Sequence, residues 1–139
     1  MDDFEWLDHT ADIGIRVRGK THAELFIKAA AAMFAVMANP VSSIKKEDKH
    51  SVSVEVQATD WDALLLDLLN ELLSLSDCQG VIFTEFILNK LDPTSLTGQA
   101  IGASRLHFTM ERDVKAVTAH GLKIHRTNKH LEVEVIFDV

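Results

Sequence analysis

Apolar and polar residues alternate along two stretches of the chain, and this period of two is typical of half-buried strands. The first stretch covers residues 12–18 and the second covers 51–58, where Val52, Val54 and Val56 share one face. The charged stretch 42–50 between them is expected to form a solvated loop.

Residues 22–38 show a different pattern, with apolar side chains recurring at helical spacing and few polar interruptions. Thr21 and Glu24 have the spacing of a capping box at the start of this segment. Asn39-Pro40 follows it and would end a helix. The pattern therefore predicts a long helix over 22–38.

A second helix is predicted after Thr59 and Asp62, which again have the spacing of an N-terminal cap, and it ends near 77–80. One side of this helix is apolar: Leu65, Leu68, Leu69, Leu72 and Leu73. The other side is polar: Asp67, Asn70, Glu71 and Ser74. This amphipathic pattern predicts packing on a core through the leucine side.

The C-terminal half is rich in strand signals. Residues 81–91 are β-branched and aromatic, 94–110 mix turn and strand signals, and 114–125 and 131–139 are expected to pair through a turn at 127–129. The predicted fold is α+β, with two long helices packed on a mainly antiparallel β-sheet.

Composition narrows the class of protein. A chain of 139 residues with 47% hydrophobic residues is expected to form a single domain over residues 1–139. The net charge of −7 argues against general nucleic-acid binding and allows cation binding or a basic partner. No apolar run is long enough to span a membrane, and the acidic residues 1–9 lack the apolar core expected of a signal peptide. With the single Cys78 excluding an internal disulfide, a cytoplasmic protein is expected.

Two aspartates mark the ends of predicted strands. Asp12 begins the first strand and Asp138 is the penultimate residue of the last, each on the face opposite the apolar residues. If these ends are neighbours, the two carboxylates and the terminal carboxylate of Val139 converge. At ~4 Å and a dielectric constant of ~20, each pair of charges would repel by about 4 kcal/mol. A divalent cation that prefers oxygen ligands, protonation, or contact with a basic partner would relieve this repulsion. Aspartates at strand edges also serve as solvated turn residues or caps.

Other candidate groups have simpler interpretations. His9 could act as a base beside the aspartates in a metal-dependent hydrolase, or could anchor a turn. The remaining histidines match no zinc motif, and Cys78 is expected to be a buried or half-exposed structural thiol. Asp67 and Glu71 form either a solvated helix face or a docking surface for a basic protein. Met33 and Met37 are expected to pack in the core, the alternative being an adaptable binding surface.

Five segments, in order and with similar spacing along nearly the whole chain, resemble the archease family. They are DHTADIGIRVRG near the start, AAAAMFAVM, LLLDLLNELLSLSD, VKAVTAHGLKIH and the terminal VIFDV. The resemblance implies a small α+β protein that is not itself an enzyme. It implies a helper of an RtcB-type tRNA-splicing RNA ligase, promoting guanylylation of the ligase with GTP and multiple turnover. Chaperone-like modulation of a tRNA-modifying methyltransferase is the secondary role, without direct, specific nucleic-acid binding.

The resemblance also implies a metal site formed by Asp12, Asp138 and Val139. The expected cofactor is a divalent cation, Ca²⁺ in first place, with Mg²⁺ or Mn²⁺ as alternatives. The turn at Asp8 and His9 would support Asp12. Lys115 in VKAVT matches a further motif of the family. It would either contact the ligase or neutralise the acidic cluster.

Overall fold

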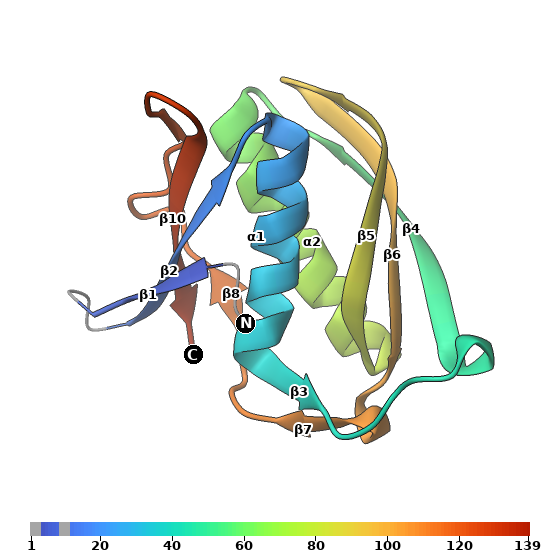
Figure 1. Cartoon of the computed structure of the whole chain (residues 1–139). Helices are drawn as coiled ribbons and strands as arrows, with labels where there is room; N and C mark the ends of the chain where they lie inside the picture. Colours follow the sequence, from blue (N-terminus) through green and yellow to red (C-terminus); the bar gives the residue numbers. More distant parts are fainter. Residues whose placement is uncertain (1–3, 9–11) are drawn as a thin grey trace.

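Two α-helices lie between two antiparallel sheets in the computed structural model, which describes residues 4–8 and 12–139 (Figure 1). The helices are α1 (His22–Met37) and α2 (Trp61–Gln79), and the short 3₁₀ helices are η1 (Lys46–Asp48) and η2 (Arg105–His107). The strands are β1 (Phe4–Leu7), β2 (Ile13–Gly19), β3 (Ala38–Pro40), β4 (Lys49–Gln57), β5 (Val81–Asp92), β6 (Ser95–Ser104), β7 (Phe108–Met110), β8 (Ala116–Val117), β9 (His125–Arg126) and β10 (Leu131–Asp138).

The strands form three sheets, whereas the sequence predicted one. The first has the order β1-β2-β10-β8, with β9 also paired to β10, and the second has the order β4-β6-β5. The third consists of the short strands β3 and β7. All the described pairs are antiparallel. The mixed α/β class and the antiparallel pairing agree with the prediction. Separate sheets arise because the helices occupy the space between them.

The first helix begins as the sequence predicted. Thr21 Oγ1 accepts a hydrogen bond from Glu24 N at 3.1 Å, and Glu24 Oε1 accepts one from Lys20 N at 3.3 Å. These two contacts satisfy backbone N–H groups at the helix start. The helix ends at Met37 because the chain becomes extended at Ala38 and enters β3. The segment Asn39-Pro40 thus belongs to a strand as well as ending the helix.

The cap of the second helix differs by one residue from the prediction. Asp60 is the N-cap, and its Oδ1 accepts from Ala63 N at 2.9 Å, whereas Thr59 was expected. Both residue types can cap, so their spacing alone could not decide between them. Gly80 ends α2 with a φ of +65°, a conformation that favours glycine.

One hydrophobic cluster joins both helices to both large sheets. The predicted leucine side of α2 is buried, and α1 is buried on a broad face that leaves Ala31 and Ala35 exposed. Met33 and Met37 are 0% and 2% exposed, which confirms that they pack in the core. Within the described residues, no helix is both long and apolar enough to cross a membrane.

The largest errors of the sequence prediction lie in the short strands. Strand β1 was missed, and the segment 114–125 contains only the two-residue strand β8 and the first residue of β9 instead of one continuous strand. The ambiguous segment 94–110 contains β6, η2 and β7. The turn before β6 is fixed by Asp92, whose Oδ1 accepts hydrogen bonds from the N–H groups of Thr94 and Ser95.

Candidate functional site

The antiparallel register of β2 and β10 brings the two ends of the chain together. Ile13 pairs with Phe137, so the next residues, Asp12 and Asp138, lie at adjoining strand ends. Both aspartates are exposed, and Val139 is 48% exposed. The predicted candidate residues Asp12, Asp138 and Val139 therefore share one corner of the molecule. Whether they bind a cation there stays a prediction.

The other side of the β10 end is held by the segment before β8. Lys115 N donates to the backbone oxygen of Asp138 at 2.8 Å, and Thr118 N donates to that of Ile136 at 2.9 Å. Ala116 pairs directly with Asp138. Asp138 thus lies between β2 on one side and residues 115–116 on the other, so its backbone is fixed from both directions.

Helix α2 supports this segment through one side chain. Asn70 Oδ1 accepts from Val117 N at 2.9 Å, and Asn70 Nδ2 donates to Val117 O at 3.1 Å. The amide group thereby serves as a partner for the backbone of β8, as a neighbouring strand would. Sequence reasoning assigned Asn70 only to the polar side of the helix.

Lys115 also lines a polar cavity of about 390 Å³ next to the corner. Asp77, Arg105 and Asp113 contribute further charged groups to its wall. Arg105 Nη2 lies 3.7 Å from Asp77 Oδ1. Side chains of both signs of charge therefore line this cavity. The structure thus gives Lys115 a place beside the candidate site through its backbone.

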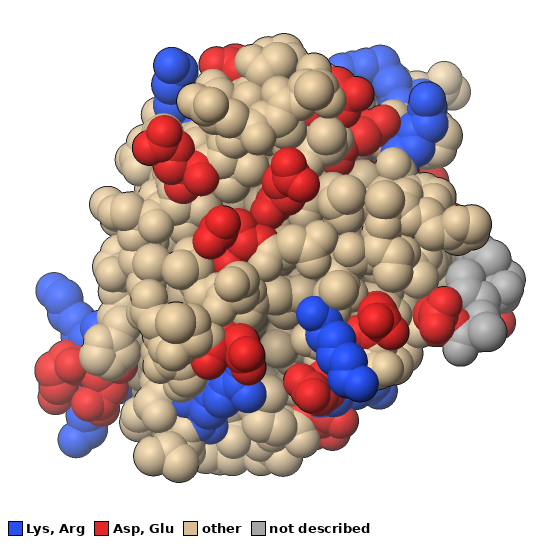
Figure 2. All heavy atoms as spheres, turned by 180° about the vertical axis from the view of Figure 1, so that it is seen from behind, with Lys and Arg blue, Asp and Glu red and all other residues tan. Residues whose placement is uncertain are grey.

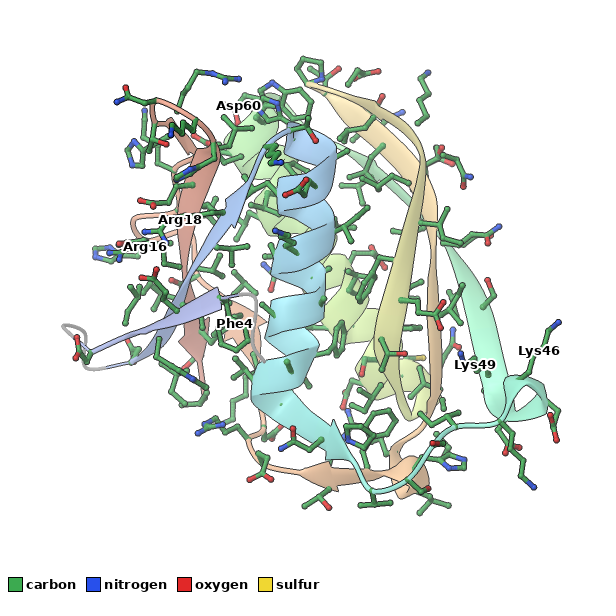
Figure 3. The ribbon with its side chains drawn as sticks, in the orientation of Figure 1. Phe4, Arg16, Arg18, Lys46, Lys49 and Asp60 are labelled. Atoms are coloured by element: carbon green, nitrogen blue, oxygen red, sulfur yellow. The ribbon has the colours of Figure 1, made fainter. Side chains whose placement is uncertain are left out.

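Ion pairs cover the outer face of the β1-β2-β10 sheet, on the side away from the helices (Figure 3). Arg16 contacts Glu134 at 2.6 Å and Glu5 at 3.2 Å. Arg18 contacts Glu132 at 2.7 Å and also pairs with Glu5. Each arginine therefore joins β2 to both neighbouring strands. This agrees with the predicted polar face of residues 12–18.

These ion pairs shift the pKa values of Glu5 and of the two arginines. Hydrogen bonding to Arg18 holds the pKa of the Glu5 carboxyl below its ordinary value, and Arg16 adds to the effect. Hydrogen bonding to Glu134 raises the pKa of Arg16. These groups stay charged around neutral pH, and the opposite charges favour the register that aligns Ile13 with Phe137.

The donor set at the corner fits a hard divalent cation in chemical type. Asp12 and Asp138 supply exposed carboxylate oxygens, and the terminal carboxylate belongs to Val139. Ca²⁺, Mg²⁺ and Mn²⁺ favour such oxygen ligands. Among the described residues, no group of three or more His, Cys, Asp or Glu side chains is arranged to hold a metal ion. A divalent cation at this corner would therefore need the Val139 carboxylate or water molecules as ligands in addition to Asp12 and Asp138.

Other candidate residues do not extend the site. His9 lies outside the described residues, so its interpretation as a base or a turn anchor stays open. Cys78 is exposed near the end of α2, which makes the expectation of a buried or half-exposed thiol wrong. The leucines around it pack on the core, but its own position lies on the solvent side of the last helical turn.

Comparison with known proteins identifies the family. The chain matches the Archease protein family over residues 4–139. It is 40% identical to the protein archease of Pyrococcus furiosus over 132 residues, covering 91% of this chain and 90% of the relative. It is 36% identical to the protein archease of Methanothermobacter thermautotrophicus over 143 residues, covering all of both chains.

Two solved structures share the fold. The solution structure of Methanobacterium thermoautotrophicum protein 1598 superposes with a TM-score of 0.78 at 34% identity and covers 100% of both chains. The crystal structure of a Thermotoga maritima protein, described as an archease and possible chaperone, has a TM-score of 0.66 at 21% identity, with coverage of 96% and 94%. The family match spans the adjoining ends of β2 and β10, and this chain belongs to the archease family.

Proposed function

We propose that this protein is a non-enzymatic activator of an RtcB-type tRNA-splicing RNA ligase. It promotes guanylylation of the ligase with GTP and multiple turnover through a divalent-cation site at Asp12, Asp138 and Val139. Membership of the archease family supports the choice of partner. The observation that carries the site is the pairing of Ile13 with Phe137, which makes exposed carboxylates neighbours.

The chain's own residues would present this corner to the ligase. Asp12 and Asp138 are exposed, so a partner can approach them without a change in the core. The pairings of Asp138 with Ala116 and of Phe137 with Ile13 fix the backbone on both sides. A cation held there would supply positive charge toward the phosphates of GTP. Binding could equally shift the ligase toward its reactive conformation.

A chaperone-like role is the second candidate, because the Thermotoga maritima relative is described as a possible chaperone. Its clients would include a tRNA-modifying methyltransferase. A metal-dependent hydrolase that uses the same aspartates is the third candidate. A hydrolase would turn over phosphodiester substrates without any partner, whereas an activator would not.

The decisive experiment uses catalytic amounts of an RtcB-type ligase with GTP, Mn²⁺ and RNA ends. Adding this protein should speed both guanylate transfer to the ligase and multiple-turnover ligation. Asp12→Asn and Asp138→Asn should each abolish the gain, while Asp48→Asn, a half-buried change in η1, should preserve it. Equal stimulation by all the variants would refute the assigned site, and phosphodiester hydrolysis by the protein alone would favour the hydrolase.

A further inference from the structure

Strand β4 forms an edge of its sheet, since β6 is its partner on one side and no other described strand pairs with the opposite side. Its register with β6 runs without interruption from Lys49 to Gln57, and this segment contains no proline. Alternate residues of such an edge direct their N–H and C=O groups away from the sheet. The strand therefore offers an unbroken row of backbone donors and acceptors.

The other strand edges are shorter or less regular. The register of β5, at the opposite edge of the same sheet, shifts between Phe83 and Glu85 and again between Leu88 and Lys90. In the other sheets, β1 has four residues and β3 and β8 have three and two. Bulges and short strands are common means of preventing unwanted strand addition. Among the described strands, β4 lacks both of these protections.

Beside the β4 edge lies a groove of about 450 Å³ between β4 and α2. Glu55 and Gln57 of β4 form one wall, and Asp67, Glu71 and Ser74 of α2 contribute to the other. Three of these side chains are carboxylates, and no cationic side chain lines the groove. On the face opposite that of Figure 1, acidic side chains gather across the upper middle (Figure 2).

Strand β4 is fixed to the core by its buried side chains. Val54 and Val56 are 6% and 7% exposed and pack into the core that includes α2. The exposed residues Ser51, Ser53 and Glu55 alternate with them. Lys49 pairs with Glu85 at 2.8 Å and lies at the end of β4 opposite Glu55 and Gln57 (Figure 3 labels Lys49).

We propose that the β4 edge binds an extended basic segment of a partner protein as an added strand. The backbone of that segment would pair with β4, and Lys or Arg at alternate positions, on the side of the sheet that faces α2, would meet Asp67 and Glu71. A second copy of this chain is a poorer occupant. Two acidic grooves would then approach one another, and each chain carries a net charge of −7.

This inference is independent of the proposed ligase activation. In Figure 1, β4 lies across the helix layer from β2 and β10, the strands whose ends carry Asp12 and Asp138. Binding of a peptide and stimulation of a ligase are separate readouts. A negative result in the peptide-binding test would therefore not contradict the proposed ligase activation, and a negative ligase assay would not contradict peptide binding.

The test uses fluorescence anisotropy with a short synthetic peptide in which Lys alternates with Thr or Val. A second peptide of the same sequence is N-methylated at alternate amides, and a third carries Glu in place of Lys. We expect N-methylation to weaken binding by roughly tenfold or more, because it removes backbone hydrogen bonds and keeps the charge. The Glu peptide should not bind. Amide exchange should slow in residues 49–57 when the Lys peptide is added.

The protein variants separate the groove from net charge. Asp67→Asn combined with Glu71→Gln should weaken binding of the Lys peptide by roughly tenfold. The control, Glu111→Gln with Asp113→Asn, makes the same change in net charge away from the groove and should bind as the unaltered protein does. Equal affinity for the methylated peptide, equal loss in both double variants, or a stable dimer in light scattering that excludes the peptide would each overturn the proposal.

Discussion

The imidazole of His22 lies flat against the indole of Trp61, with 3.8 Å between the ring centroids and 11° between the ring planes. His22 is the first residue of α1 and Trp61 is the first residue of α2, so the stack joins the starts of the two helices. Phe26 contacts the same indole edge-on, with the ring centroids 5.8 Å apart. The two helices are thereby fixed to one another at one end.

This contact predicts a pH dependence of stability. Burial lowers the pKa of His22 below its ordinary value of 6.5, and the charge of Arg126 lowers it further. Below about pH 6.5 the unfolded chain therefore binds a proton that the folded chain does not. The contribution of His22 is constant above that pH and becomes destabilising as the pH falls toward the folded-state pKa.

The measurement is the free energy of urea unfolding at several pH values for the unaltered protein and for His22→Phe, which keeps an aromatic ring against Trp61. The difference between the two proteins should change between pH 7 and pH 5, about the range in which histidine titrates. In NMR titrations, Arg126→Gln should raise the pKa of His22. A His22 that titrates above its ordinary value would contradict this account.

Replacing Asn70 should loosen β8. Asn70→Leu removes two hydrogen bonds to Val117 and leaves that backbone without its side-chain partner, so we expect a loss of about 1–3 kcal/mol. Amide exchange at Val117 should become faster. Ser74→Ala, one turn further along the exposed side of α2, is the matched control and should unfold like the unaltered protein. A loss as small for Asn70→Leu as for the control would show that the amide bonds are dispensable.

Gly19 is expected to tolerate no side chain. A Cβ at Gly19 would lie 2.6 Å from Leu25 N and 2.8 Å from Leu25 Cα, which are backbone atoms that cannot move independently of α1. Gly19→Ala should therefore cost about 1–3 kcal/mol. Gly80→Ala meets no atom within 4 Å but retains a φ of +65°, so only backbone strain of about 1–2 kcal/mol applies. Thermal unfolding of both variants, together with Gly80→Asn as the milder replacement, tests these two causes separately.

A divalent cation should stabilise the folded protein through Asp12 and Asp138. At a concentration of about 100 times Kd, one bound ion adds about 2.7 kcal/mol to the free energy of unfolding. Melting temperatures measured at graded Ca²⁺ or Mn²⁺ should rise for the unaltered protein and for Asp48→Asn, and should stay flat for Asp138→Asn. In a chelator, Asp138→Asn should be at least as stable as the unaltered protein, because the substitution removes like-charge repulsion. An equal cation effect on both variants would exclude Asp138 as a ligand.

The long elements could be predicted because many residues repeat one signal. The alternation over 12–18 and the Thr21–Glu24 cap correspond closely to β2 and the start of α1. Strands β3, β8 and β9 have two or three residues each, too few for a periodic pattern. Their positions depend on distant partners, such as Asn70 for Val117, and no local pattern of residues encodes those contacts.

The sequence predicted which strand face carries Asp12 and Asp138, but it did not predict the residues that lie next to them. The parity of Asp12 and Asp138 followed from alternation within each strand. The neighbours that complete the corner, Lys115 and Ala116, come from an irregular segment predicted as continuous strand. The division of the strands into separate sheets could not be predicted either, because the same alternation of residues fits a strand of any sheet.

The small side chains in the middle of α1 set the thickness of the whole molecule. Ala29, Ala30 and Ala32 are each at most 3% exposed, because this helix has a sheet on either side of it. A bulkier residue at one of these positions would press on a sheet, because in the middle of α1 only Ala31 and Ala35 face solvent. A single substitution in the central layer would then disturb both sheets at once, through β2 on one side of α1 and β5 on the other.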